Sequence, residues 1–345
     1  MRRPGVKALV SIGGWTGSRY FSANVATAAK RAAFVKTVSD FAKKYNLDGI
    51  DFEYVHTLLR VIVPSNHRST SWEYPNNQGI GCNIISSSDT ANFLAFLQLL
   101  RADPVGKGLI LSAATATVPF MDANGSPSSS VAGFSKVLDW IALMNYDLWG
   151  PWSPTVGPNA PLDDSCAAES NRAGSATSAV TKWVKAGIPV SQLVLAVPGY
   201  GHSFRVRKAN AFKAGSTTVL ASYPQFDASS RPVGDEWDDP AGVDVCGAQQ
   251  SQGGVINFWG LIKNGYLNDD GSVKAGIAST FDACSQTAFV YNSQTEIMVS
   301  YDNAQSFTAK GKFIKTKALR GFAMWEAGGD HKSILVNSIR SAAGF

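Results

Sequence analysis

The chain alternates between short apolar runs and longer stretches in which apolar residues recur every three or four positions. Residues 6–12 form one such run and predict a strand. Phe34, Val38 and Phe41 recur at helical spacing and predict a helix over 27–45. The same two patterns predict further strands at 109–114, 139–145, 193–198 and 320–326, and further helices at 90–102, 131–137, 175–186, 304–316 and 331–342. This alternation is typical of βα units, so the sequence predicts an α/β fold with a parallel sheet.

The regular alternation of strand and helix patterns is interrupted between residues 205 and 303. Short segments separated by turn-forming residues replace the regular alternation there. This stretch is therefore expected to form a smaller α+β part, distinct from the regular units on either side of it.

Composition narrows the class of protein. Charged residues make up 17% of the 345 residues, which is below the ordinary range for globular proteins, and hydrophobic residues make up 45%, which is within it. This composition predicts a globular protein rather than a disordered one. The net charge of +5 is spread along the chain without a Lys/Arg block, so we expect no nucleic-acid partner. No apolar run is long enough to cross a membrane, and no glycine loop of the phosphate-binding kind is present. We accordingly expect no cofactor.

Closely spaced acidic residues lie on another apolar run. Asp51 and Glu53 are two positions apart, residues 54–71 follow, and Trp72 and Glu73 come next. Carboxylates two apart on a strand point to the same face. Their mutual repulsion raises a carboxyl pKa, which suits general acid catalysis near neutral pH. The alternative is a solvated strand edge, which the surrounding apolar residues disfavour.

Removing residues 54–71 joins the two parts into LDGIDFEWEYP, which resembles the DxxDxDxE motif of glycoside hydrolase family 18, the chitinases and chitinase-like lectins. Four more segments resemble strands of this family in the same order. They are SxGG at 11–14, MxYD at 144–147, PxYG at 198–201 and the last strand, with its tryptophan, at 321–326. The five ordered matches extend over nearly the whole chain, and the resemblance is to the fungal type of this family.

The resemblance implies a (β/α)8 TIM barrel with a small α+β insertion before the last strand. The barrel would comprise residues 1–204 and 304–345, and the insertion residues 205–303. In the family the SxGG strand is the third of eight, so we expect the first two βα units and a signal peptide to be missing from this sequence. An incomplete barrel has unpaired edges, and residues 54–71 separate Asp51 from Glu73. On these two grounds the chain as written is expected to fold poorly or to be inactive.

The resemblance also implies roles for individual residues. Glu73 would be the general acid and Asp51 its outer carboxylate, while Tyr146 and Asp147 would contact the sugar that carries the reacting acetamide. The middle aspartate of the motif has no clean equivalent, because Glu53 and Ser71 stand on either side of the interruption. The expected substrate-binding residues are Gly14, Trp15, Trp72, Met144, Tyr200 and Trp325. His202 stands where arginine is common in the family, and we leave it out of the catalytic set.

The codons for residues 54–71 are consistent with a retained intron. If Glu53 is encoded by GAG, its last base and the codons of Tyr54 and Val55 can spell an intron donor, and the Ser71 codon can supply the acceptor. Splicing there would leave an aspartate codon and restore DGIDFDWEYP. A true insertion is the minority interpretation.

The resemblance implies a chitinase that hydrolyses β-1,4 linkages between N-acetylglucosamine units by substrate-assisted, retaining catalysis. The alternative is a chitin-binding lectin that has lost catalysis; such relatives usually lose the glutamate, whereas Glu73 persists here. A small-molecule or nucleotide enzyme on the same barrel is the third hypothesis. The expected partners are chitin or its oligomers, and we expect a monomer.

The four cysteines lack CxxC spacing, so a zinc site is not expected, and their even number suits an oxidising compartment. We expect an extracellular protein. Cys82 and Cys166 each follow a strand that resembles a barrel strand, and Cys246 and Cys284 share the predicted insertion. These positions predict the pairs Cys82–Cys166 and Cys246–Cys284.

Overall fold

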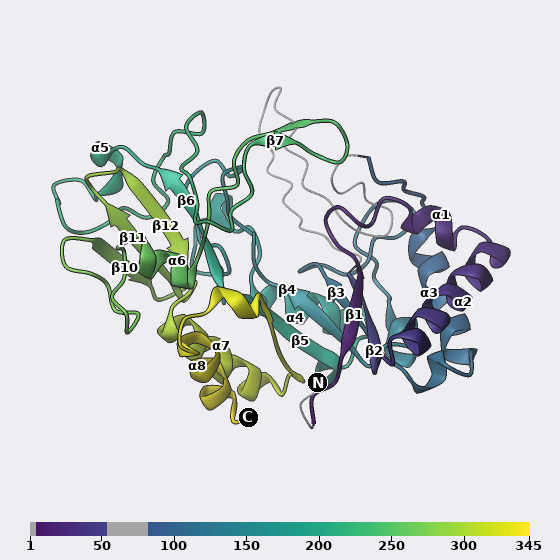
Figure 1. Ribbon diagram of the computed structural model, residues 1–345. Coiled ribbons are helices and arrows are strands. Elements are labelled where there is room, and N and C mark those ends of the chain that lie inside the picture. Colours follow the sequence, from purple (N-terminus) through teal and green to yellow (C-terminus); the bar gives the residue numbers. More distant parts are fainter. Residues whose placement is uncertain (1–4, 54–81) are drawn as a thin grey trace. The chain divides into compact units, whose positions relative to one another are not determined.

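The computed structural model describes residues 5–53 and 82–345, and these divide into two compact units (Figure 1). The described part of the first unit runs to Met144 and also includes Ala179–Val194. The second unit includes Asn145–Ser178 and Leu195–Phe345. Each unit is described by itself below.

Four parallel strands form the sheet of the first unit. They are β1 (Leu9–Gly13), β2 (Gly49–Glu53), β3 (Ile110–Thr115) and β4 (Trp140–Met144), and they pair in chain order. The register places Ser11 opposite Asp51, and Asp51 opposite Ser112. One row of side chains therefore crosses three neighbouring strands at the same level.

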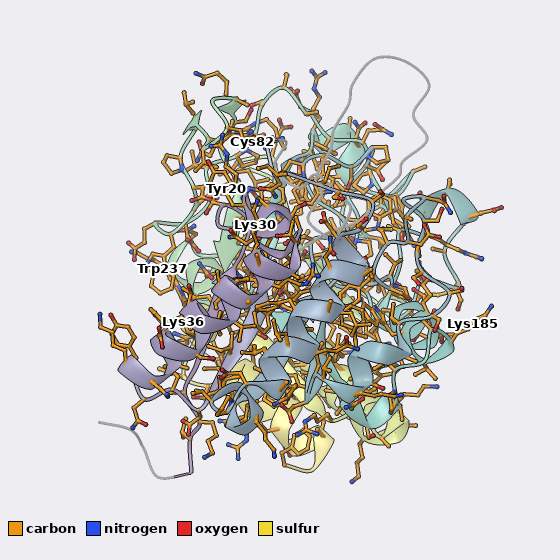
Figure 2. All side chains as sticks on the ribbon, turned by 90° about the vertical axis from the view of Figure 1, so that its right-hand side faces the viewer. Tyr20, Lys30, Lys36, Cys82, Lys185 and Trp237 are labelled. Atoms are coloured by element: carbon orange, nitrogen blue, oxygen red, sulfur yellow. A yellow bond between two sulfur atoms is a disulfide. The ribbon has the colours of Figure 1, made fainter. Side chains whose placement is uncertain are left out.

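Helices connect these strands. They are α1 (Phe21–Val25), α2 (Ala28–Lys44), α3 (Asp89–Ala102) and the 3₁₀ helices η1 (Gly106–Gly108), η2 (Ala132–Lys136) and η4 (Val190–Gln192). The Thr27 hydroxyl caps α2 by accepting the Lys30 backbone N–H at 3.3 Å. Lys30 and Lys36 project from the outer side of α2 (Figure 2), while Val35 and Val38 are buried. Of the residues whose spacing predicted this helix, Val38 is buried and Phe34 is partly buried, but Phe41 is exposed. The spacing therefore predicted the helix correctly but not its buried side, which also includes Val35 and Ala42.

An aromatic core lies on one face of this sheet. Phe52 on β2 meets Phe93 and Phe96 of α3 edge-to-face, with ring centroids 5.8 and 5.6 Å apart. Phe93 in turn contacts Phe120, which meets the Trp183 ring at 5.2 Å. Edge-to-face aromatic pairs of this kind add about 0.5–1.5 kcal/mol each beyond the burial of their area. Because Phe52 faces this core, its neighbours Asp51 and Glu53 must face the other side of the sheet.

An antiparallel sheet is the main feature of the second unit. Its strand order is β10-β11-β12-β6-β9, and the element bounds are β6 (Tyr200–Arg205), β9 (Val255–Asn257), β10 (Ala278–Asp282), β11 (Thr287–Asn292) and β12 (Ile297–Tyr301). A small separate pair consists of β7 (Gly242–Val243) and β8 (Gln249–Gln250). The sheet packs over a core that includes Phe204, Tyr291 and Met298.

The remaining elements of this unit are helical, apart from one strand. They are η3 (Glu169–Asn171), α5 (Lys208–Ala211), α6 (Phe258–Lys263), α7 (Ala304–Lys317), β13 (Gly321–Trp325), η5 (Ala327–Gly329) and α8 (Ile334–Ala343). Helices α7 and α8 pack together, and β13 lies beside β5 (Leu193–Pro198). Helix α4 (Ala176–Lys185) and strand β5 run from one unit into the other. Across residues 5–53 and 82–345, no helix combines the length and the apolar character needed to cross a membrane.

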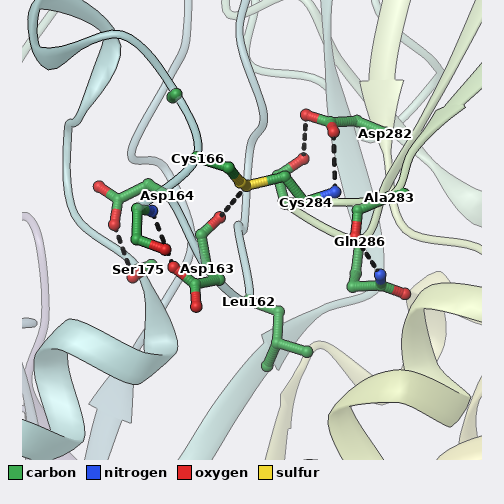
Figure 3. The surroundings of a disulfide bond; sticks show 12 residues. Leu162, Asp163, Asp164, Cys166, Ser175, Asp282, Ala283, Cys284 and Gln286 are labelled. Atoms are coloured by element: carbon green, nitrogen blue, oxygen red, sulfur yellow. Dashed lines mark hydrogen bonds between the residues drawn. A yellow bond between two sulfur atoms is a disulfide. The ribbon is translucent and has the colours of Figure 1, made fainter.

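The disulfide pairing predicted from the sequence is wrong. Cys166 pairs with Cys284, with 6.3 Å between the two Cα atoms (Figure 3), which excludes both expected pairs. Cys82 and Cys246 are also disulfide-bonded. The Cys284 backbone N–H donates to Asp282 at the end of β10, and its sulfur contacts the Asp163 carbonyl at 3.8 Å. The bridge therefore joins the hairpin after β10 to the loop around Asp163, a proximity that sequence position did not reveal.

The predicted alternation of strands and helices is confirmed, with ends that differ by at most three residues. One element differs in kind, because residues 132–136 form a 3₁₀ helix where a longer helix was expected. The antiparallel sheet starts at Tyr200, within the segment assigned to the barrel. The boundaries proposed for the insertion stay a prediction. Residues 54–71 lie outside the described chain.

Candidate active site

Two acidic side chains from β2 form the centre of the first unit's candidate site. Asp51 and Glu53 share the face opposite Phe52, as the two-residue period of a strand requires. Both side chains are partly buried. The Ser11 hydroxyl on β1 lies between them, 3.0 Å from Asp51 Oδ2 and 3.2 Å from Glu53 Oε2. One serine therefore links both carboxyl groups.

A second serine holds Asp51 from the opposite side. Ser112 lies on β3 in register with Asp51, and its hydroxyl donates to Asp51 Oδ1 at 2.5 Å. Each oxygen of the Asp51 carboxylate thus has a serine partner, one from β1 and one from β3. This arrangement fixes the orientation of Asp51, because both partners are anchored on paired strands.

Burial dominates the electrostatics of this pair. Desolvation raises the pKa of Asp51, while the hydrogen bonds from Ser112 and Ser11 oppose the rise. Desolvation likewise raises the pKa of Glu53, and the neighbouring Asp51 charge raises it further. Two adjacent carboxyl groups with raised pKa values can retain a proton closer to neutral pH than an exposed pair could. That property is the one general acid chemistry requires.

Two glycines bring the chain after β1 close to Glu53. The Gly14 backbone N–H donates to the Glu53 carbonyl at 2.7 Å. A Cβ on Gly13 would lie 2.3 Å from that carbonyl oxygen, and Gly13 and Gly14 have φ angles of 115° and 84°. Only glycine satisfies both conditions without strain. The SxGG segment thus places Gly14 against Glu53 and leaves the Trp15 side chain 46% exposed.

The second unit has its own acidic centre at Asp147. Its Oδ1 atom accepts the Tyr200 hydroxyl at 2.8 Å and lies 2.8 Å from His202 Nε2. The Tyr146 ring meets the Tyr200 ring edge-to-face at 6.1 Å. Asp147 has a φ of 55°, in the left-handed region that few residues other than glycine adopt. The backbone at this position is therefore held by its surroundings.

Tyr200 acts in this cluster as a hydrogen-bond donor. Burial raises its pKa well above the ordinary value, and the Asp147 charge raises it further. The phenol consequently keeps its proton over the whole physiological range. The proton directs the hydroxyl toward the Asp147 carboxylate.

His202 belongs to this cluster although the sequence analysis left it out. Its ring lies against the Trp152 ring, with centroids 5.2 Å apart, and its side chain is 5% exposed. A signal for this role was present in the sequence, because arginine is common at this place in the resembled family and histidine can also donate to a carboxylate. Ser112 was missed as well, because its contact with Asp51 depends on strand register.

The other residues expected at the site either end a strand of one unit or lie outside the described residues. Met144 ends β4 in the first unit and is buried. Trp325 ends β13 in the second unit, its side chain is 54% exposed, and its carbonyl accepts the Gly199 N–H at 2.7 Å. Trp72, Glu73 and Ser71 lie outside the described residues.

Among the residues that the structure describes, no group of three or more His, Cys, Asp or Glu side chains is arranged to hold a metal ion. The two clusters are made instead of carboxylates, hydroxyls, an imidazole and aromatic rings. These groups can transfer protons, donate hydrogen bonds and stack against a sugar ring.

The known proteins to which this chain is similar are chitinases and chitinase-like proteins. A chitinase-like effector from Moniliophthora roreri is 53% identical, and the match covers 99% of this chain and 78% of that protein. Chitinase A1 from Niallia circulans is 28% identical over 98% of this chain and 42% of that protein. The crystal structure of a chitinase from Rhizomucor miehei matches with a TM-score of 0.84 at 30% identity, covering 99% of this chain and 85% of that one.

The profile of glycosyl hydrolases family 18 matches residues 1–330, which is nearly the whole chain. The α/β fold, the carboxylates on β2 and the similarity to solved chitinases agree with this match. The chain belongs to glycosyl hydrolase family 18.

Proposed function

We propose that this protein is a chitinase, which hydrolyses β-1,4 linkages between N-acetylglucosamine units with retention of anomeric configuration. The observation that carries the proposal is the Asp51–Glu53 pair on β2, bridged by Ser11 and with both carboxyl pKa values raised. A pair of carboxyl groups that share one face of a parallel strand, both with raised pKa values, is a candidate for acid–base chemistry.

In this proposal Glu73 protonates the oxygen of the leaving sugar. The acetamide of the substrate then supplies the nucleophile, as in the substrate-assisted glycosidases. Position 53 carries the middle carboxylate, which is Glu53 in this chain and would be aspartate if residues 54–71 were spliced out. That group orients the acetamide, and Asp51 supplies the second negative charge, held in place by its two serines.

The proposal also names the groups that hold the sugar. Tyr146 and Asp147 bind the sugar that carries the reacting acetamide, with the Asp147 carboxylate oriented by Tyr200 and His202. The exposed indole of Trp325 provides an apolar surface for that sugar, since aromatic rings stack well on the C–H face of a pyranose. Gly14, Trp15, Trp72 and Met144 complete the proposed substrate-binding set.

The test compares two forms of the protein, the chain as written and the chain without residues 54–71 that carries aspartate at position 53. Each is assayed on N-acetylglucosamine oligomers, with the anomeric form of the first product recorded by NMR. We expect the shortened form to hydrolyse with retention. Inverted product, or equal cleavage of fully deacetylated chains, would contradict the mechanism.

The Glu73→Gln variant separates catalysis from binding. Loss of general acid assistance should lower the rate by about 10²–10⁴ while oligomer binding by calorimetry persists. The matched control is Glu169→Gln, which changes an exposed glutamate in η3 and should leave both quantities unchanged. If the parent binds oligomers without cleaving them, the chain is a chitin-binding protein. That outcome is informative because close relatives are named chitinase-like effectors.

Two further expectations belong to this proposal. All four cysteines are disulfide-bonded, which supports an extracellular location because disulfides persist in oxidising compartments.

Sequencing the mature transcript across the codons for residues 45–80 tests the retained intron. A dominant, translated transcript that keeps the codons for 54–71 would show that the segment is part of the protein.

A further inference from the structure

A single buried amide connects the backbones of Asp147 and Tyr200. Asn159 is fully buried. Its Oδ1 accepts the Asp147 backbone N–H at 2.9 Å, and its Nδ2 donates to the Tyr200 backbone carbonyl at 3.2 Å. Asn159 therefore holds the main chain of the two residues whose side chains meet in the hydrogen bond between the Tyr200 hydroxyl and the Asp147 carboxylate.

The geometry requires an amide at position 159. The side chain must accept at one atom and donate at the other, and among short side chains only asparagine does both in a neutral form. An aspartate could accept the Asp147 N–H, but it has no donor for the Tyr200 carbonyl at neutral pH. An alanine would leave a buried N–H and a buried carbonyl without these partners, which costs about 1–3 kcal/mol per group.

Asn159 is itself anchored at its backbone. Its N–H donates to the Ser300 hydroxyl at 3.0 Å, and its carbonyl accepts the Leu148 N–H at 3.1 Å. Ser300 lies on β12 in register with His202 on β6. The loop that contains Asn159 is thereby attached to β12, the strand that pairs with β6, which carries both His202 and Tyr200.

We propose that Asn159 is a positioning residue, which holds Asp147 in its left-handed conformation so that the carboxylate meets Tyr200 and His202. The φ of 55° at Asp147 has an energetic cost that surrounding contacts must offset, and the hydrogen bond to its N–H is such a contact. This inference rests on the proposed function, in which the Asp147 carboxylate binds the substrate. Asn159 acts through Asp147 and makes no contact with the sugar.

A double-mutant cycle tests the inference in the shortened form of the protein. Asn159→Ala should lower kcat/KM by about tenfold or more, the effect expected for losing a buried hydrogen bond. In an Asp147→Ala background the same change should have almost no further effect on kcat/KM, because there is no carboxylate left to orient. An equal loss in both backgrounds would mean that Asn159 only supports the fold, and would overturn the proposal.

Ser203→Ala is the matched control. Ser203 is buried on β6 and donates to the Gly254 carbonyl at 2.7 Å, so its loss also removes a buried hydrogen bond from the second unit. We expect Ser203→Ala to lower the unfolding temperature while leaving kcat/KM within about twofold of the parent, since its partner Gly254 is not part of the Asp147 cluster. If Asn159→Ala does not fold, Asn159→Ser takes its place.

A structural readout keeps this proposal separate from the proposed function. If the parent protein does not hydrolyse chitin oligomers, the proposed function fails, and the crystal structure of the Asn159 variant still decides the positioning role. We expect the Asp147 carboxylate to lie beyond hydrogen-bonding distance of the Tyr200 hydroxyl. An unchanged Asp147–Tyr200 contact would overturn the inference whatever the activity.

Discussion

Asp51 and Ser112 face each other in register on β2 and β3, and the serine hydroxyl donates to the carboxylate at 2.5 Å. This hydrogen bond lowers the pKa of a carboxyl group that burial raises. The register of β2 and β3 therefore affects the protonation of Asp51. Removing the Ser112 hydroxyl should shift the pKa of Asp51 in a predictable direction.

Ser112→Ala should raise the pKa of Asp51 further, because it removes the stronger of two hydrogen bonds to the charged form. The proposed mechanism needs negative charge in the Asp51–Glu53 pair, so activity falls when the pair becomes fully protonated. We expect the acid side of the pH–rate profile to move to higher pH. The control is Ser135→Ala, whose hydroxyl donates only to the Ala132 carbonyl. A profile unchanged from the parent would refute the role assigned to Ser112.

Asp51→Asn should increase stability at neutral pH while reducing activity by roughly 10²–10³, the loss typical of removing one preorganised electrostatic group. Because burial raises the folded-state pKa of Asp51, the folded protein binds a proton at higher pH than the unfolded chain does. The ionised side chain thus destabilises the fold at neutral pH, and this penalty disappears as pH falls through the raised pKa. Urea denaturation at several pH values measures the difference between variant and parent, which should shrink as the pH is lowered. A variant less stable than the parent at neutral pH would contradict this.

The ion pair between Lys310 and Asp302 is completely buried, with 2.6 Å between Nζ and Oδ1. Burial lowers the pKa of Lys310 and raises that of Asp302, which shows that desolvation opposes the pair. Lys310→Met alone should cost about 3–5 kcal/mol of unfolding free energy, since it leaves an uncompensated buried charge.

Replacing both partners, as Asp302→Leu with Lys310→Met, should recover most of that loss, because two apolar side chains need no compensation. Denaturant unfolding of the two single variants and the double variant gives the coupling energy. The exposed pair Lys263–Glu236 is the comparison, and Lys263→Ala should change stability by less than about 1 kcal/mol. Additive losses in the double variant of the buried pair would argue against this account.

Opening the Cys166–Cys284 disulfide should destabilise the second unit. The two cysteines are 118 residues apart, so the bridge closes a long loop of the unfolded chain. The double variant Cys166→Ser/Cys284→Ser should lose about 2–4 kcal/mol. Peptide mapping of the parent under non-reducing conditions checks the pairing directly, and finding Cys166 linked to Cys82 would contradict the structure.

The sequence by itself determined the class of fold and most of the elements. Apolar runs and helical spacing are local properties, and they placed β1, β3, β4 and β5 and the helices α2 and α3 within a few residues. Side-chain alternation on β2 likewise predicted that Asp51 and Glu53 share a face, because that depends only on the two-residue period of a strand. Motif order was sufficient to indicate the family.

Only the tertiary structure decided which distant residues meet. The cysteine pairing depends on how the loop around Asp163 approaches the hairpin after β10, and no local pattern encodes that distance. The contact of Ser112 with Asp51 depends on register, since a shift by one residue would turn the serine to the other face. His202 joins Asp147 because β6 and a loop residue with positive φ bring them together. Contacts between residues far apart in sequence are set by the packing of whole elements, whereas the elements themselves are set by their own residues.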